Sequence, residues 1–299
     1  MDDLMTPPAG PELAEERKRV LKARLLNAIE EPAARRRPWR MLIPAAGVLA
    51  VTLAVGMTVV PWHRAPAPPY VKISNGDHDA AVSFLGQAAV AAGGRPEAAG
   101  GYLYVRSRTA YLAIDGKDRA TMPEPSDREI WIPLVVGGHG LLRDGGKSRD
   151  LGPYRTIDID PGLPETADAM LAKVYAEARK SDNQVDAEAF TLIGDYLEEN
   201  ATVLRPKVVA ALYGAAARIP GVELLPDAED AAGRHGVAVA RVAGNGMTRR
   251  EWIFDAATHE YLGERTYLIE DTEQGRAGMV IGMSAVLAKA VVGKAGDRP

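Results

Sequence analysis

The chain has 299 residues, of which 25% are charged and 46% hydrophobic, so its composition is that of a globular protein rather than a disordered one. Lys and Arg together number 36 against 40 Asp and Glu, and the formal net charge of −4 disfavours a protein that binds nucleic acid directly. The absence of cysteine excludes disulfides, thiolate metal centres and thiol catalysis.

The first predicted element is a short amphipathic helix over residues 11–30, within a tail that covers residues 1–40. The segment PELAEERKRVLKARLLNAIE is rich in good helix formers, and Leu13, Leu21, Leu25 and Ile29 fall on one broad face. An isolated helix of this length is marginally stable in water, so its apolar face needs a partner. Two partners stay open: an anionic membrane surface, or a cytoplasmic protein that these four residues would contact.

Residues 41–60 predict a transmembrane helix. The segment MLIPAAGVLAVTLAVGMTVV contains no charge, and as a helix it would be about 30 Å long, the thickness of the hydrocarbon core of a bilayer. Four arginines precede it, which places the tail in the cytoplasm and the rest of the chain outside, and two tryptophans bracket it at interfacial positions. These candidate topology residues are Arg35, Arg36, Arg37, Trp39, Arg40 and Trp62. We therefore expect a single-pass protein of the cell membrane, with the lipid bilayer as one partner.

A cleaved signal peptide is the main alternative to a permanent anchor, because Ala65-Pro66-Ala67 resembles a small-residue cleavage site. Against it, Pro68 would follow the cut, and the apolar run is longer than a usual signal core. A permanent signal anchor is the preferred interpretation.

Residues 61–76 contain the Pro-rich run PWHRAPAPPY and predict a stiff linker, and residues 77–299 are long enough for one extracytoplasmic domain. Asp77 is a candidate helix N-cap. The expected helices are 77–92, 165–180, 185–200 and 205–218, and the expected strands are 101–115, 128–136, 237–242, 250–255 and 261–269, with 279–292 either strand or helix. The predicted fold class is α+β: antiparallel strands at both ends with a central group of helices, one option being a curved sheet around one helical layer.

No catalytic, cofactor-binding or metal-ligating set is found in the sequence. The segment GGHGLLRDGGKS (137–148) ends like a phosphate-binding loop, but Leu141 stands where the first glycine belongs, so a hairpin or surface loop is expected there. The five histidines, at positions 63, 78, 139, 235 and 259, have no metal-ligand spacing. We therefore expect neither an enzyme nor a bound cofactor or metal.

Two runs carry a family resemblance: ALYGAAARIPGVELLPDAEDAAGRHGVAVARV (211–242) and REWIFDAATHEYLGER (250–265). They resemble the most recognisable part of an uncharacterised actinobacterial family of single-pass membrane proteins, and RVLKARLLNAIE, GYLYVRS and REIWIP are similar to its other landmarks. Members are commonly encoded beside extracytoplasmic-function sigma factors, so the resemblance implies a sigma-factor-linked membrane regulator. It implies no reaction and no catalytic residues.

The tail departs from well-known zinc-binding anti-sigma domains, because it lacks their His/Cys signature; any inhibitory contact would come from the helix at 11–30. The order of elements also loosely resembles the half-open barrel of periplasmic lipoprotein carriers and envelope-stress sensors, an analogy of fold alone. Two functions stay open. One is a membrane-anchored signalling or regulatory protein, anti-sigma-like, with an unknown envelope ligand outside and a cytoplasmic sigma factor inside. The other is an extracytoplasmic ligand-binding or carrier module whose tail serves only for membrane insertion.

Overall fold

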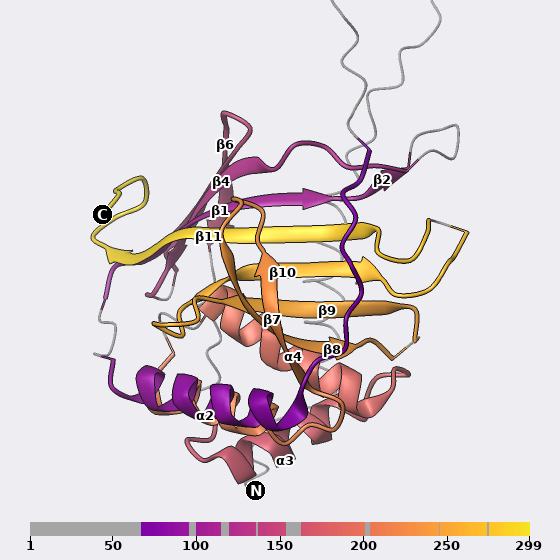
Figure 1. Ribbon diagram of the computed structural model, residues 1–299. Coiled ribbons are helices and arrows are strands. Elements are labelled where there is room, and N and C mark those ends of the chain that lie inside the picture. Colours follow the sequence, from indigo (N-terminus) through magenta and orange to yellow (C-terminus); the bar gives the residue numbers. More distant parts are fainter. Residues whose placement is uncertain are drawn as a thin grey trace, which may run out of the picture. The chain divides into compact units, whose positions relative to one another are not determined.

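The computed structural model describes residues 67–95, 100–114, 120–135, 137–153, 163–200, 204–244, 246–273 and 275–299. Nine of its strands form one antiparallel sheet, in the order β6-β5-β4-β1-β11-β10-β9-β8-β7 (Figure 1). These strands are β1 (Tyr102–Tyr111), β4 (Ser126–Pro133), β5 (His139–Asp144), β6 (Lys147–Pro153), β7 (Glu223–Glu229), β8 (His235–Val242), β9 (Thr248–Phe254), β10 (Tyr261–Leu268) and β11 (Val280–Val292). The described helices are α2 (His78–Gly93), α3 (Ala167–Ala178), α4 (Val185–Asn200) and α5 (Pro206–Ala216).

The predicted α+β class, with antiparallel strands at both ends and helices between them, is confirmed for the described residues. Asp77 caps α2 as expected, since its Oδ1 accepts a hydrogen bond from the backbone N–H of Ala80 at 2.7 Å. The segment 279–292, whose apolar pattern fits a strand or a helix, forms strand β11. The strand predicted over 101–115 is shorter than expected: β1 ends at Tyr111, and β2 (Ala113–Ile114) pairs with β3 (Ala120–Thr121) in a separate two-stranded sheet.

The segment 137–148, expected to be a hairpin or a surface loop, lies in a β-hairpin. Strands β5 and β6 pair across the turn at Gly145 and Gly146, whose φ angles of +53° and +79° favour glycine at both positions.

Among the described helices, none combines the length and the apolar character that a bilayer-spanning segment requires. The predicted span at 41–60 and the predicted tail lie outside the described residues.

The helices cover one face of the β7–β10 half of the sheet (Figure 1), and an aromatic layer joins the two. Trp252 of β9 stacks on Phe190 of α4, with ring centroids 3.7 Å apart and planes within 2°. Gly194 permits this contact, because a Cβ there would lie 2.6 Å from the indole nitrogen of Trp252. Two positions along the strand, Phe254 meets Tyr213 of α5 edge-on. The alternation of β9 thus points every second side chain into the helical layer.

Residues 69–77, which we call the strap, lead from the predicted linker into α2 and run past β11 and β9 to β7 (Figure 1). The strap is hydrogen-bonded to the sheet at several points, and each of these hydrogen bonds uses a backbone N–H or C=O group of the strap. The pairs are Pro69 with Val280 (2.9 Å), Val71 with Gly278 (2.8 Å), Ser74 with the Arg249 side chain (2.6 Å), and Asp77 with Leu224 (3.1 and 2.9 Å). The part of the predicted linker that the structure describes therefore lies along the domain.

A substitution at Gly278 tests whether the strap depends on its close contact with the chain just before β11. It has a φ of +88°, and a Cβ there would lie 2.6 Å from the carbonyl oxygen of Val71, so Gly278→Ala should displace the strap. Losing one or two hydrogen bonds, each worth about 1 kcal/mol, should speed amide hydrogen exchange in the strap about tenfold. Exchange followed by mass spectrometry on peptides covering residues 69–77 measures this.

Gly152→Ala is the matched control. Gly152 also has a positive φ, +75°, but nothing lies within 4 Å of its missing Cβ. Equal acceleration of strap exchange in both variants would show that backbone strain, and not the contact with Val71, is responsible.

Candidate functional site

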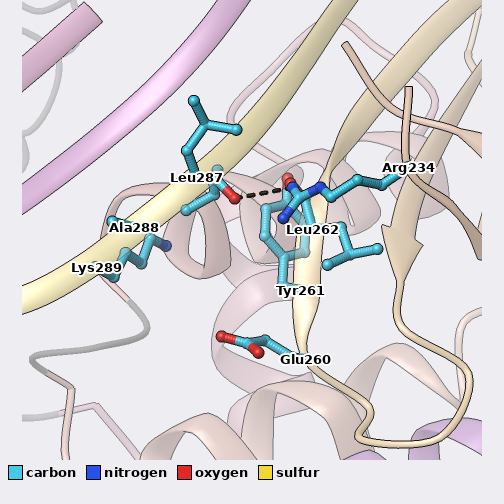
Figure 2. Close-up of a pocket in the computed structure, with 8 residues that line it drawn as sticks. Arg234, Glu260, Tyr261, Leu262, Leu287, Ala288 and Lys289 are labelled. Atoms are coloured by element: carbon cyan, nitrogen blue, oxygen red, sulfur yellow. Dashed lines mark hydrogen bonds between the residues drawn. The ribbon is translucent and has the colours of Figure 1, made fainter. Parts of the chain in front are cut away.

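The sheet is split between β10 and β11. The two strands pair over the three positions from Arg265 to Tyr267 and still approach closely where Gly263 meets the backbone of Ser284, but the ladder does not continue to Leu262 and Val286. Arg234, from the turn before β8, fills the split: its guanidinium donates to the carbonyl oxygens of Leu262 on β10 (2.9 Å) and Val286 on β11 (2.8 Å) (Figure 2). One side chain thus replaces the backbone ladder there.

Asp230 fixes the orientation of Arg234. Its carboxylate is fully buried and accepts a hydrogen bond from the Nε of Arg234 at 2.7 Å. It also accepts the backbone N–H groups of Ala232 and Arg234, so the turn is closed around it. The remaining space in the split is a small cavity of about 130 Å³, lined by Tyr261, Lys289 and their neighbours (Figure 2).

A cluster of charges lies between the sheet and α4. Arg250 of β9 donates to Glu264 of β10, at 2.9 Å from Nε, and to Asp195 of α4 at 3.0 Å. Ser284 of β11 donates to Glu198 of α4 at 3.3 Å and accepts the backbone N–H of Glu264 at 3.2 Å. We call these five residues the α4 cluster. It ties one helix to three strands through polar contacts.

Burial sets the protonation of the α4 cluster. The side chains of Arg250 and Glu264 are each only 16% exposed. Burial, reinforced by the negative charge of Glu198, raises the pKa of Glu264 to about 7 despite the opposing effect of Arg250. Burial lowers the pKa of Arg250, but the carboxylates of Glu264 and Asp195 outweigh it, so the net shift is upward and Arg250 stays charged.

Tyr261 and Lys289 extend the α4 cluster toward the split. The Lys289 ammonium donates to the carbonyl oxygens of Leu197 (3.3 Å) and Glu198 (2.6 Å) near the end of α4, where a cation also interacts well with the helix dipole. It lies 5.7 Å from the ring centroid of Tyr261. The Tyr261 hydroxyl is buried without a hydrogen-bond partner among the described residues, and burial raises its pKa well above 10.

Within the described ranges, no group of three or more His, Asp or Glu side chains could hold a metal ion. The four described histidines each have one polar contact with a single neighbour. These are His78 with the carbonyl of Val222, His139 with Asp150, His235 with Asp227, and His259 with Gln87.

All ten site residues predicted from the sequence lie outside the described residues, so the contact face of the helix at 11–30 and the topology residues stay predictions. Sequence reasoning missed the α4 cluster. Strand alternation places Arg250 on the same face as Trp252, but nothing in the sequence pairs it with Glu264 and Asp195, which come from other elements. A signal was available in Glu264 itself, a carboxylate in the middle of a predicted strand.

No protein-family model matches this chain, and no curated protein matches it. Two similar solved structures are the Pseudomonas aeruginosa MucA/MucB complex, at 12% identity, and MucB in complex with MucA(peri), at 10% identity. Each alignment covers 74% of this chain and 58% of the other, with a TM-score of 0.24. The chain therefore spans little more than half the length of those structures, and a likeness this weak does not bear on function.

Glu264 should make stability depend on pH. Its pKa is about 7 in the folded state and 4.5 ordinarily, so the folded state keeps a proton that the unfolded state releases between these values. The corresponding stability is complete below about pH 4.5 and lost as the pH rises through about 7. Urea unfolding at pH 5 and pH 8 should differ by on the order of 2 kcal/mol from this group.

The Glu264→Gln variant should remove most of that difference while keeping a hydrogen-bonding side chain beside Arg250. The exposed carboxylate of Glu260, four residues earlier, supplies the control Glu260→Gln, which should leave the pH dependence of the parent protein intact. An unchanged pH dependence in Glu264→Gln would contradict the assignment.

Proposed function

We propose that this chain is a membrane-anchored regulatory protein, not an enzyme, with its N-terminal tail in the cytoplasm and its C-terminal domain outside the cell membrane. The uncharged segment 41–60, with its flanking arginines and tryptophans, supports this topology.

The strap is the observation that carries the proposal. The predicted span ends at residue 60, and from Pro69 onward the chain is hydrogen-bonded to β11, β9 and β7. The domain is thus joined to its predicted anchor through a segment that is hydrogen-bonded to the sheet. A ligand that alters the sheet would change the segment nearest the membrane, which is what a receiver of envelope signals requires.

The cytoplasmic partner in this proposal is a sigma factor, bound in an anti-sigma-like manner by the helix at 11–30. Its support is the family resemblance, together with an apolar face that needs covering. Leu13, Leu21, Leu25 and Ile29 would form the contact.

The alternative is a ligand-binding or carrier module that acts wholly outside. The described domain has its own helix–sheet core and its own cavities, which favours a function independent of the tail. In that case the tail would serve membrane insertion alone, and a heterologous anchor would support full function.

Cross-linked co-purification from native membranes separates the two. We expect the intact chain to capture a sigma factor, and a chain lacking residues 11–30 to lose it. The double variant Leu21→Asp/Leu25→Asp should lose it as well, because two charges would interrupt the apolar contact.

Ala23→Asp/Asn27→Asp is the matched control. It creates the same two aspartates at the same four-residue spacing, but on the opposite face of the predicted helix. It should insert into the membrane and retain the partner. Capture of the same envelope proteins by every variant, with no sigma factor, would move the function outside.

A further inference from the structure

A second and larger hollow lies on the sheet face opposite the α4 cluster. It encloses about 510 Å³ where β1, β4, β5 and β6 lie side by side. The sheet register places Glu129 opposite Arg143, and Arg143 opposite Ser148, so these three side chains share one face. The C-terminal segment forms one wall, because the Trp131 indole N–H donates to the carbonyl of Asp297 at 2.5 Å.

Both carboxylates of this hollow already have cationic partners. Hydrogen bonds from Arg298 are the main reason that the pKa of Glu129 is lowered to about 2, so this group stays ionised. Asp127 accepts hydrogen bonds from Arg106 (3.1 Å) and Arg108 (2.6 Å). Glu129 accepts hydrogen bonds from Arg298 (2.7 and 2.8 Å) and also from the neutral Tyr104 hydroxyl (2.7 Å).

Arg143 is different from the other arginines of the hollow. Its guanidinium lies 5.0 Å from the ring centroid of Trp131, which is fully buried and therefore a fixed platform. No described carboxylate lies within 4.0 Å of Arg143. The stacking holds the planar fork in place while its hydrogen-bond donors remain available.

The pairing of charges defines the ligand. Arg106 and Arg108 share Asp127, and Arg298 is paired with Glu129. Of these arginines around the hollow, Arg143 is therefore the one that lacks a carboxylate partner among the described residues. A carboxylate, with one negative charge and two oxygens that match the arginine fork, would neutralise Arg143. The hollow is also too large for one carboxylate alone, so it has room for the chain that bears it.

We propose that this hollow binds a carboxylate-bearing segment of a partner protein, with Arg143 making the two-point contact and Ser148 beside it. The inference deepens the proposed function, since it gives the chemistry of the signal that the outer domain would receive.

The test is titration calorimetry on the full-length chain in dodecyl maltoside, a detergent without charge. The probes are acetyl-(Ala-Glu)₃-amide, its Gln counterpart acetyl-(Ala-Gln)₃-amide, acetate and inorganic phosphate. We expect saturable binding of the Glu peptide alone, weakened at least tenfold by Arg143→Gln and only partly restored by Arg143→Lys, which keeps the charge but not the fork.

Arg149→Gln is the matched control. Arg149 lies next to Ser148 on β6, so its side chain projects to the other face, and the change in net charge is the same. Equal weakening by both variants would reduce the binding to general electrostatics and overturn the proposal. Acetate that binds as tightly as the Glu peptide would overturn the proposal that the ligand is a segment of a partner protein. Phosphate that binds more tightly than the Glu peptide would overturn the proposal that the ligand is a carboxylate.

Ser148→Asp keeps the test decisive if Arg143→Gln fails to fold. Ser148 is exposed, and the new carboxylate would occupy the place of the ligand beside Arg143, so binding should again fall at least tenfold. Undiminished binding to a folded Ser148→Asp variant would overturn the assignment. The purified chain contains no sigma factor, so this result is independent of the co-purification that tests the regulatory function.

Discussion

The architecture depends on the pairing of β11 with β1 at the middle of the sheet. These strands match over ten positions, from Tyr102 opposite Val292 to Tyr111 opposite Gly282. On one side of the pair lie β4, β5 and β6, and on the other lie β10, β9, β8 and β7. The two halves come from opposite ends of the described chain, and among the described strands only this ladder joins them. The helices cover one half, and the arginine-rich hollow lies in the other.

The polar contacts between the sheet and α4 have a cost as well as a benefit. Apolar residues of similar size would avoid the desolvation of Arg250 and Glu264, so stability alone does not account for the pair. What the pair supplies is a defined position for α4, because a buried guanidinium must meet its carboxylates. The Phe190–Trp252 stack acts on the same helix through shape. One helix face is thereby fixed by both packing and charge.

Elements with a regular pattern could be predicted from the sequence, and the others could not. The helix over 185–200 has the predicted bounds, because good helix formers and a steady apolar spacing agree there. Strand β7 was missed because its sequence, ELLPDAE, contains Pro226 and three acidic residues. The structure explains this: β7 is an edge strand, and its register with β8 shifts between Leu225 and Ala228, around the proline. The periodicity of a sequence predicts which face of a strand a side chain lies on, but not which other strand or helix it contacts. The α4 cluster and the hollow around Arg143 each combine residues from several elements, so neither could be predicted before the strand order was known.

The strap has a consequence for how the protein is made. Pro69 and Val71 are bound by Val280 and Gly278, which are synthesised some two hundred residues later. The segment closest to the predicted anchor therefore leaves the ribosome early but acquires its hydrogen bonds only when the last strand is in place. Until then it can form neither contact, and an incomplete chain differs from a finished one at the position nearest the predicted anchor. The hydrogen bonds of the strap, at the start of the domain, therefore form only when the fold is complete.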